Sequence, residues 1–245
     1  MKVTALLSEK NKALYNNRPV TIGFLGDSVT QGCFELVPCF SESGELTYNT
    51  IFETESSYSA KLRTILNKFY PKAQINIINA GISGDRAPGG LSRMERDLLP
   101  YHPDLTVVCF GLNDSGSGDA GLQQYHDALV SIVRKLKEAG SEVILMTPQP
   151  ICARKHAQLQ IESLGPTMQT LVENFHNGAF ERYIQQMRTV AQEEAVPLCD
   201  VYAKWMALYH SGVDITELLA NYLNHPTRDM HWLFAISLAE IIFTA

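Results

Sequence analysis

Residues 20–32 read Val-Thr-Ile-Gly-Phe-Leu-Gly-Asp-Ser-Val-Thr-Gln-Gly, an apolar run that leads into a glycine turn and a serine. The near-continuous apolar character of 20–25 indicates a strand buried on both faces, because a strand with one wet face alternates. Gly26-Asp27-Ser28 then places a serine at the turn after the strand. A helix start at such a turn also offers backbone N–H groups to a developing negative charge. Taken alone, the tripeptide also fits a plain turn in which Ser28 caps a helix.

Outward from this stretch, strand-like and helix-like patterns alternate along the chain. Further strands are predicted at 75–78, 105–110, 143–146 and 196–199. Helices are predicted at 58–69, 91–99, 122–139 and 180–194, with a last one after Pro226. Strands that alternate with helices form a parallel sheet with right-handed crossovers. We therefore expect a three-layer α/β/α fold with a doubly wound parallel sheet of about five strands, in one domain over residues 1–245.

Composition narrows the possible partners and compartments. Twenty basic residues against 26 acidic ones give a net charge of −6, so neither nucleic acid nor a membrane is an expected partner. The first residues carry too short an apolar run for a signal peptide, and no run approaches a membrane span. Five scattered cysteines without a C-x-x-C pair favour free thiols over disulfides or a zinc site. We expect a cytoplasmic protein.

Polar residues follow three of the predicted strands, where function collects in parallel α/β sheets. Besides Gly-Asp-Ser, Asn-Ala-Gly-Ile-Ser-Gly-Asp occupies 79–85 and Gly-Leu-Asn-Asp occupies 111–114. Near the end of the chain, Asn-His-Pro at 224–226 places His225 in a loop, because proline biases the residue before it away from helix. His231 falls in the last predicted helix, where packing or a hydrogen bond is the expected role.

These four blocks, in this order, resemble those of the GDSL-type serine esterases, the SGNH hydrolase family. The resemblance implies a flavodoxin-like SGNH hydrolase fold, Ser28 as nucleophile and His225 as base. It implies an oxyanion hole made by the backbone N–H groups of Ser28 and Gly84 and by the side-chain amide of Asn113. The expected substrate is a small-molecule ester, short-chain or an O-acetylated carbohydrate, cleaved through an acyl-enzyme with no cofactor and no metal.

One departure from the family pattern concerns the third catalytic group. Family members usually carry Asp-x-x-His-Pro, but this chain has Tyr222 where the aspartate stands. A histidine base needs an acceptor at Nδ1 to fix its tautomer. A backbone carbonyl, the Tyr222 hydroxyl, Asp214 or Asp229 could supply it. For Asp27 and Asp114, which neighbour the predicted site, we expect local hydrogen bonds to backbone N–H groups.

Two other functions remain open at this stage. A catalytically weak or inactive relative that binds a carbohydrate or ester would keep the fold and lose the aspartate. A nucleotide-binding protein is the other alternative, although the glycine spacing fits no phosphate loop. The long segments 33–57 and 148–178 are expected to be loops that shape the acyl and alcohol pockets. The sequence leaves the substrate-binding residues and the oligomeric state unassigned.

Overall fold

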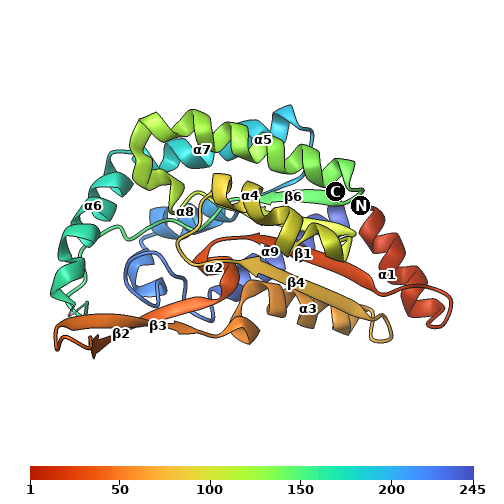
Figure 1. The fold of residues 1–245 in the computed structure, drawn as a ribbon, viewed down its shortest axis with the longest axis horizontal. Helices are drawn as coiled ribbons and strands as arrows, with labels where there is room; N and C mark the ends of the chain where they lie inside the picture. Colours follow the sequence, from red (N-terminus) through yellow and green to blue (C-terminus); the bar gives the residue numbers. More distant parts are fainter. Residues whose placement is uncertain (160) are drawn as a thin grey trace.

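A five-stranded parallel sheet forms the centre of the computed structural model, which describes residues 1–159 and 161–245. The strands are β1 (Val20–Gly26), β4 (Ile75–Gly81), β5 (Leu105–Cys109), β6 (Glu142–Met146) and β7 (Leu198–Cys199). Their order is β4-β1-β5-β6-β7, and every neighbouring pair is parallel (Figure 1). The order reverses direction at β1, so the doubly wound α/β prediction is confirmed.

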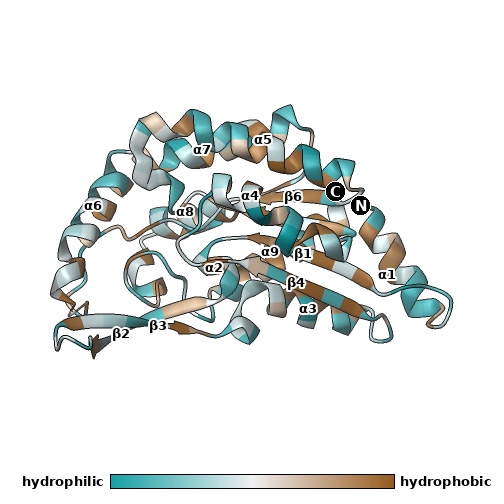
Figure 2. Cartoon of the chain, in the orientation of Figure 1, coloured by the Kyte–Doolittle hydropathy of each residue, from teal (hydrophilic) through white to brown (hydrophobic). Residues whose placement is uncertain are grey.

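Two apolar layers cover the faces of the sheet because strand side chains alternate between them. Phe24 of β1 belongs to one apolar cluster, which includes residues of α1 (Lys2–Lys12), α3 (Tyr58–Phe69), α6 (Gly165–His176), α8 (Val201–His210) and α9 (His231–Thr244). Leu25 of the same strand belongs to a second cluster, which includes residues of α4 (Ala87–Asp97), α5 (Leu122–Glu138) and α7 (Ala179–Glu193). Figure 2 shows the strands as mainly hydrophobic between helices with hydrophilic outer faces.

The predicted elements agree with the structure more closely at strands than at helix ends. The helix predicted at 58–69 has these bounds in the structure. The last helix begins at His231, not directly after Pro226, and α1, α6 and α8 were not predicted. The remaining helical elements are short: α2 (Ser28–Gln31), η1 (Thr54–Ser56), η2 (Leu99–Tyr101), η3 (Asp114–Gly121), η4 (Glu162–Leu164) and η5 (Ile215–Leu218).

The segment 33–57, expected as a loop, is mostly an antiparallel hairpin, and that expectation was wrong. Strands β2 (Cys33–Phe40) and β3 (Leu46–Phe52) pair with each other in a sheet of their own. Figure 1 shows this hairpin as a long ribbon at the lower left, extending to below α6. A two-stranded ribbon leaves most side chains half-exposed, so the hydrophobic periodicity that reveals buried strands is weak here. The other long segment, 148–178, contains α6.

None of the helices in the described ranges has both the length and the apolar content that crossing a membrane requires.

Candidate active site

Ser28 stands at the junction between strand β1 and a short helix. Strand β1 ends at Gly26, Asp27 caps α2, and Ser28 is the first residue of that helix. The Asp27 carboxylate accepts the backbone N–H of Val29 at 3.0 Å, which is the local role predicted for it. The serine is 3% exposed, so only a narrow approach to its hydroxyl remains. The strand-turn-helix arrangement that the sequence indicated is therefore present.

Glycine at position 81 lets β4 approach helix α2 directly. A Cβ added at Gly81 would lie 2.3 Å from the backbone nitrogen of Gln31, a distance no side chain tolerates. The Asn79 side-chain amide donates to the Thr30 carbonyl at 2.7 Å across the same contact. The loop after β4 is thus fixed beside Ser28.

The loop that carries His225 is organised by one asparagine. The Asn221 Oδ1 atom accepts the backbone N–H groups of Leu223, Asn224 and His225 at 2.9–3.0 Å. This turn directs the imidazole toward β1, and the His225 Nε2 atom lies 3.0 Å from the Ser28 Oγ atom. Two side chains far apart in the sequence are therefore within hydrogen-bond distance, as a serine nucleophile and its base require.

The other nitrogen of this imidazole meets a backbone carbonyl. The His225 Nδ1 atom lies 3.0 Å from the carbonyl oxygen of Phe34. The Tyr222 hydroxyl bonds instead to Gln158, at 2.5 Å. Asp214 accepts hydrogen bonds from Arg154 and from the backbone N–H of Thr216. The sequence left four possible acceptors open for His225 Nδ1, and the one that lies there is a backbone carbonyl.

Burial controls the protonation of His225. The residue is 7% exposed, and burial lowers the pKa of its imidazole below 6.5, while the hydrogen bond to the Phe34 carbonyl opposes that shift. The imidazole is therefore neutral at pH 7 and can accept a proton. His231 has a different role, because its Nδ1 atom accepts the backbone N–H of Tyr58 at 3.0 Å inside the core. The expected role of His231, packing or a hydrogen bond, is confirmed.

The two predicted oxyanion residues lie on loops that are joined to each other. Gly84 has a positive φ of 79°, a conformation that favours glycine. The side-chain amide of Asn113 donates to the backbone carbonyl of Asp85, the residue after Gly84, at 2.9 Å. Asp114 accepts the backbone N–H groups of Gly111 and Ala87, at 3.0 and 2.9 Å, so its predicted local role is also confirmed.

Arg93, on α4, supports this edge of the sheet and was not singled out from the sequence. Its guanidinium donates to the carbonyl of Gly26, the last residue of β1, at 2.9 Å and to that of Ala80, the next-to-last residue of β4, at 2.7 Å. It also binds the Asp85 carboxylate at 2.6 Å. The side chain of Arg86, the residue before α4, donates to Ser117 at 2.9 Å. An arginine on the buried side of an amphipathic helix was the available signal.

Two buried carboxylates near Ser28 titrate unusually. Burial raises the pKa of Asp27 to about 7, and the charges of Asp114 and Asp85 add to the effect. Burial likewise raises the pKa of Asp114 to about 6, against the hydrogen bonds from backbone N–H groups. Among the described residues, the Oδ2 atom of Asp27 has no hydrogen-bond partner. Charging either carboxylate near neutral pH therefore costs free energy.

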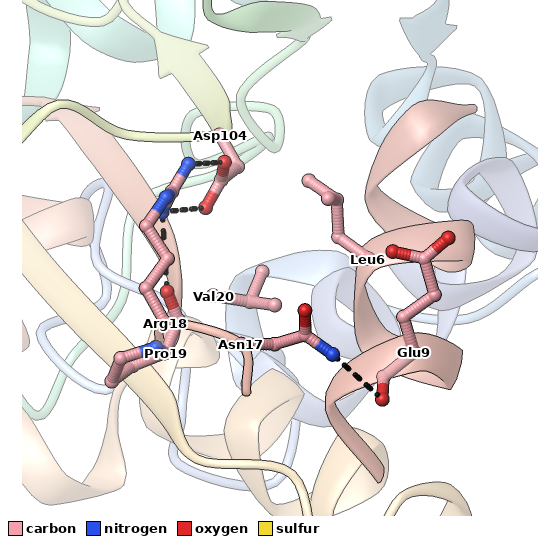
Figure 3. A pocket seen from close by; sticks show the side chains of 7 residues that line it. All are labelled: Leu6, Glu9, Asn17, Arg18, Pro19, Val20 and Asp104. Atoms are coloured by element: carbon pink, nitrogen blue, oxygen red, sulfur yellow. Dashed lines mark hydrogen bonds and ion pairs between the residues drawn. The ribbon is translucent and has the colours of Figure 1, made fainter. Parts of the chain in front are cut away.

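A separate pocket of about 220 Å³ lies at the opposite edge of the sheet (Figure 3). It sits at the amino-terminal end of β1, and an ion pair between Arg18 and Asp104 closes one side of it. Its lining residues are Leu6, Glu9, Asn17, Arg18, Pro19, Val20 and Asp104. Within 1–159 and 161–245, no three His, Cys, Asp or Glu side chains are grouped so as to hold a metal ion.

Comparison with known families accounts for this arrangement. Residues 24–233 match the model of the GDSL-like lipase/acylhydrolase family. The chain belongs to this family. The match includes Ser28, both loops with the predicted oxyanion residues, and His225.

Two relatives of this GDSL-family chain align with about half of it. An acetylxylan esterase of Geobacillus stearothermophilus is 29% identical over 134 residues, covering 51% of this chain and 58% of the relative. An uncharacterised lipoprotein, YqeF, of Bacillus subtilis is 27% identical over 132 residues, covering 50% and 54%. The alignments thus span little more than half the length of each relative.

Solved structures share the fold over nearly the whole chain. The acetylxylan esterase Axe2 of Geobacillus stearothermophilus superposes with a TM-score of 0.64 at 22% identity, covering 92% of this chain and 95% of Axe2. A two-domain esterase active on acetylated mannans gives a TM-score of 0.67 at 21% identity, covering 98% of this chain and 52% of that one. At these identities the likeness establishes the SGNH hydrolase fold.

Proposed function

We propose that this protein is a carboxylic ester hydrolase in which Ser28 is the nucleophile and His225 the general base. The observation that carries the proposal is the 3.0 Å distance between the Ser28 Oγ and His225 Nε2 atoms. A serine hydroxyl attacks an ester only when a neighbouring base removes its proton. The lowered pKa of His225 keeps that base neutral at pH 7. Membership of the GDSL-like family supports the same chemistry.

The reaction would proceed by acyl transfer in two steps. The Ser28 Oγ atom attacks the ester carbonyl carbon, and its proton passes to His225 Nε2. The backbone N–H groups of Ser28 and Gly84 and the Asn113 amide would bind the carbonyl oxygen as it becomes negative. One N–H of this amide bonds to the Asp85 carbonyl, and that bond aims the second N–H. His225 then protonates the leaving alcohol, and water, deprotonated by His225, releases the acid from the acyl-enzyme.

For the substrate we propose a short acyl ester, with an acetylated carbohydrate as the preferred class. Two observations support a small acyl group: Ser28 and His225 are only 3% and 7% exposed. The names of an acetylxylan esterase and of an esterase active on acetylated mannans among the similar proteins favour acetyl groups on sugars. We also propose that residues 1–245 act as one SGNH hydrolase domain.

We propose that the protein is cytoplasmic. All five cysteines are free thiols, which fits a reducing compartment. One relative is named a lipoprotein, so fractionation of the expressing cells followed by immunoblotting is the direct test. Recovery of the protein in a membrane or exported fraction would contradict the proposal.

A non-catalytic carbohydrate-binding protein is the second candidate, because Tyr222 replaces the aspartate usual in the family. The deciding experiment treats the folded protein with a fluorophosphonate and maps the adduct by peptide mass spectrometry. Hydrolysis of p-nitrophenyl acetate and of acetylated xylo-oligosaccharides is measured in parallel, with Ser28→Ala as control. Adduct on Ser28 and hydrolysis that the Ser28→Ala substitution abolishes are expected. A folded protein without adduct or hydrolysis would select the binding function.

A further inference from the structure

Four residues form a cluster beside the Phe34 carbonyl that meets His225. Arg228 donates to Glu53 through Nε and Nη2, at 2.7 and 2.6 Å. It also donates to Glu35 through Nη1 and Nη2, at 2.5 and 3.0 Å. Its guanidinium lies over the Phe34 ring, 4.4 Å from the ring centroid. One arginine thus binds two carboxylates bidentately and stacks on the residue whose carbonyl faces the imidazole.

The backbone around Phe34 is irregular where this cluster holds it. The pairing of β2 with β3 shifts register between Cys33 and Leu36, the interval that contains Phe34 and Glu35. Such a bulge leaves a residue outside the ladder and redirects its backbone groups. Here the Phe34 carbonyl points to His225 Nδ1. Because no ladder partner fixes this carbonyl, another contact must keep it in place.

The charges of the cluster make Arg228 its centre. The Arg228 guanidinium lowers the pKa of Glu53 to about 2 and lowers that of Glu35, so both carboxylates are charged at neutral pH. Without the guanidinium, two negative groups would face each other across the start of β2 and the end of β3. Like charges that face each other across two paired strands repel, and this repulsion would open the bulge.

We infer that Arg228 is a positioning residue for His225: it holds the bulge at Phe34 and Glu35 so that the Phe34 carbonyl stays at the Nδ1 atom. Arg228 belongs to the same loop as His225, three residues further along. The loop that carries the imidazole therefore also anchors its acceptor, and the cluster replaces the fixed aspartate of the family pattern. This inference rests on the proposed function of the Ser28–His225 pair.

A purely structural role makes a different prediction. The Arg228 side chain is 35% exposed, and exposed ion pairs contribute little to stability. Loss of Arg228 would then change neither the stability nor the chemistry of the protein by much. A positioning role predicts a loss in kcat without a matching loss in stability.

The test compares Arg228→Ala and Arg228→Lys with Arg134→Ala, which removes an ion pair on α5 in which Nε and Nη2 both contact the Glu194 Oε1 atom. Steady-state hydrolysis of p-nitrophenyl acetate, thermal unfolding and the downfield imidazole N–H proton resonance are measured for each. His225→Gln assigns that resonance. We expect Arg228→Ala to lower kcat ~10-fold or more with KM changed less than ~2-fold, because tautomer control acts on the chemical step. The His225 resonance should broaden or disappear.

Arg228→Lys should recover part of kcat, since an ammonium keeps the charge but not the bidentate geometry. Arg228→Ala with kcat within ~2-fold of the unmutated protein, or a kcat loss no larger than that of Arg134→Ala at equal melting temperature, would overturn the inference. If Arg228→Ala does not fold, Glu35→Gln takes its place, with the same readouts. If the unmutated protein hydrolyses no ester, the proposed function fails, and the effect of Arg228→Ala on the His225 resonance still decides the inference.

Discussion

The Nδ1 atom of His225 and the carbonyl oxygen of Phe34 lie 3.0 Å apart, although 191 positions separate the two residues in the chain. Nδ1 must carry the proton in this bond, which leaves Nε2 free to accept the proton of Ser28. The carbonyl thus sets the tautomer that a base requires. Unlike a carboxylate, it brings no full negative charge to the imidazolium formed during attack.

Removing the carboxylates nearest to His225 in the sequence should have little effect. Asp214→Asn and Asp229→Asn are expected to keep kcat for p-nitrophenyl acetate within ~3-fold, because neither carboxylate orients the imidazole. Tyr222→Phe should behave alike, since its hydroxyl bonds to Gln158. A fall of ~10²-fold or more in any of the three would identify that side chain as the orienting group.

Asn113→Ala should lower kcat by ~10²–10³-fold and leave KM nearly unchanged, because an oxyanion donor acts mainly in the transition state. Initial rates over a range of p-nitrophenyl acetate concentrations separate the two constants. Circular dichroism and thermal unfolding check that the fold is intact, since the Asn113 amide also bonds to the Asp85 carbonyl. A change confined to KM would remove Asn113 from the oxyanion hole.

The pH profile of kcat/KM should fall on the acid side at a pH below 6.5. Burial lowers the pKa of His225, so the base stays neutral, and active, at pH values where an exposed histidine is protonated. Asp27 titrates nearby, at about 7, so the profile is repeated with Asp27→Asn. An acid limb centred above 6.5 in both proteins would contradict a buried neutral base.

Arg93→Ala should reduce the free energy of unfolding in urea by about 3 kcal/mol or more, because it leaves a carboxylate and two carbonyls without their buried partner. Arg96→Ala is the matched control on the same helix. The Arg96 side chain is 74% exposed against 9% for Arg93, and both bind Asp97. The control should change stability by no more than about 0.5 kcal/mol. Equal losses would mean that the buried hydrogen bonds of Arg93 contribute no more to stability than a surface ion pair.

Asp27 should make stability depend on pH. Its pKa is about 7 in the folded protein and 3.8 in the unfolded reference, so its contribution is complete at low pH and is lost as pH rises toward 7. Relative to Asp27→Asn, the unmutated protein should lose up to about 1.4 kcal/mol per pH unit in this interval. Asp114 is present in both proteins, so the difference isolates Asp27. Parallel curves from urea unfolding at several pH values would disprove the raised pKa.

The sheet could be predicted from the sequence because its strands are buried on both faces. Leu105–Cys109 is apolar at nearly every position, and a short run of this kind is typical of a strand buried on both faces. The hairpin β2–β3 was missed because its strands are half-exposed and Pro38 interrupts the apolar pattern. Helix α8 was missed because its apolar residues are spread around the helix and define no single face.

The candidate site, like the fold, was predicted from the sequence only in part. The resemblance to the GDSL family indicated Ser28, His225, Gly84 and Asn113, and three of these follow the ends of parallel strands, which meet at one edge of the sheet. The sequence left the acceptor of His225 open, because a backbone carbonyl has no motif. Arg93 acts through contacts set by tertiary packing, and no spacing in the chain indicates them.

The bond from His225 to Phe34 also has a genetic consequence. Every residue carries the same carbonyl, so a substitution at position 34 changes the side chain and leaves the acceptor atom behind. Alanine at position 34 would remove the buried ring that lies under Arg228 but not the acceptor atom, so its effect would report on the ring and not on the hydrogen bond. Natural selection can act on the His225–Phe34 hydrogen bond only through residues that determine the position of the backbone at Phe34.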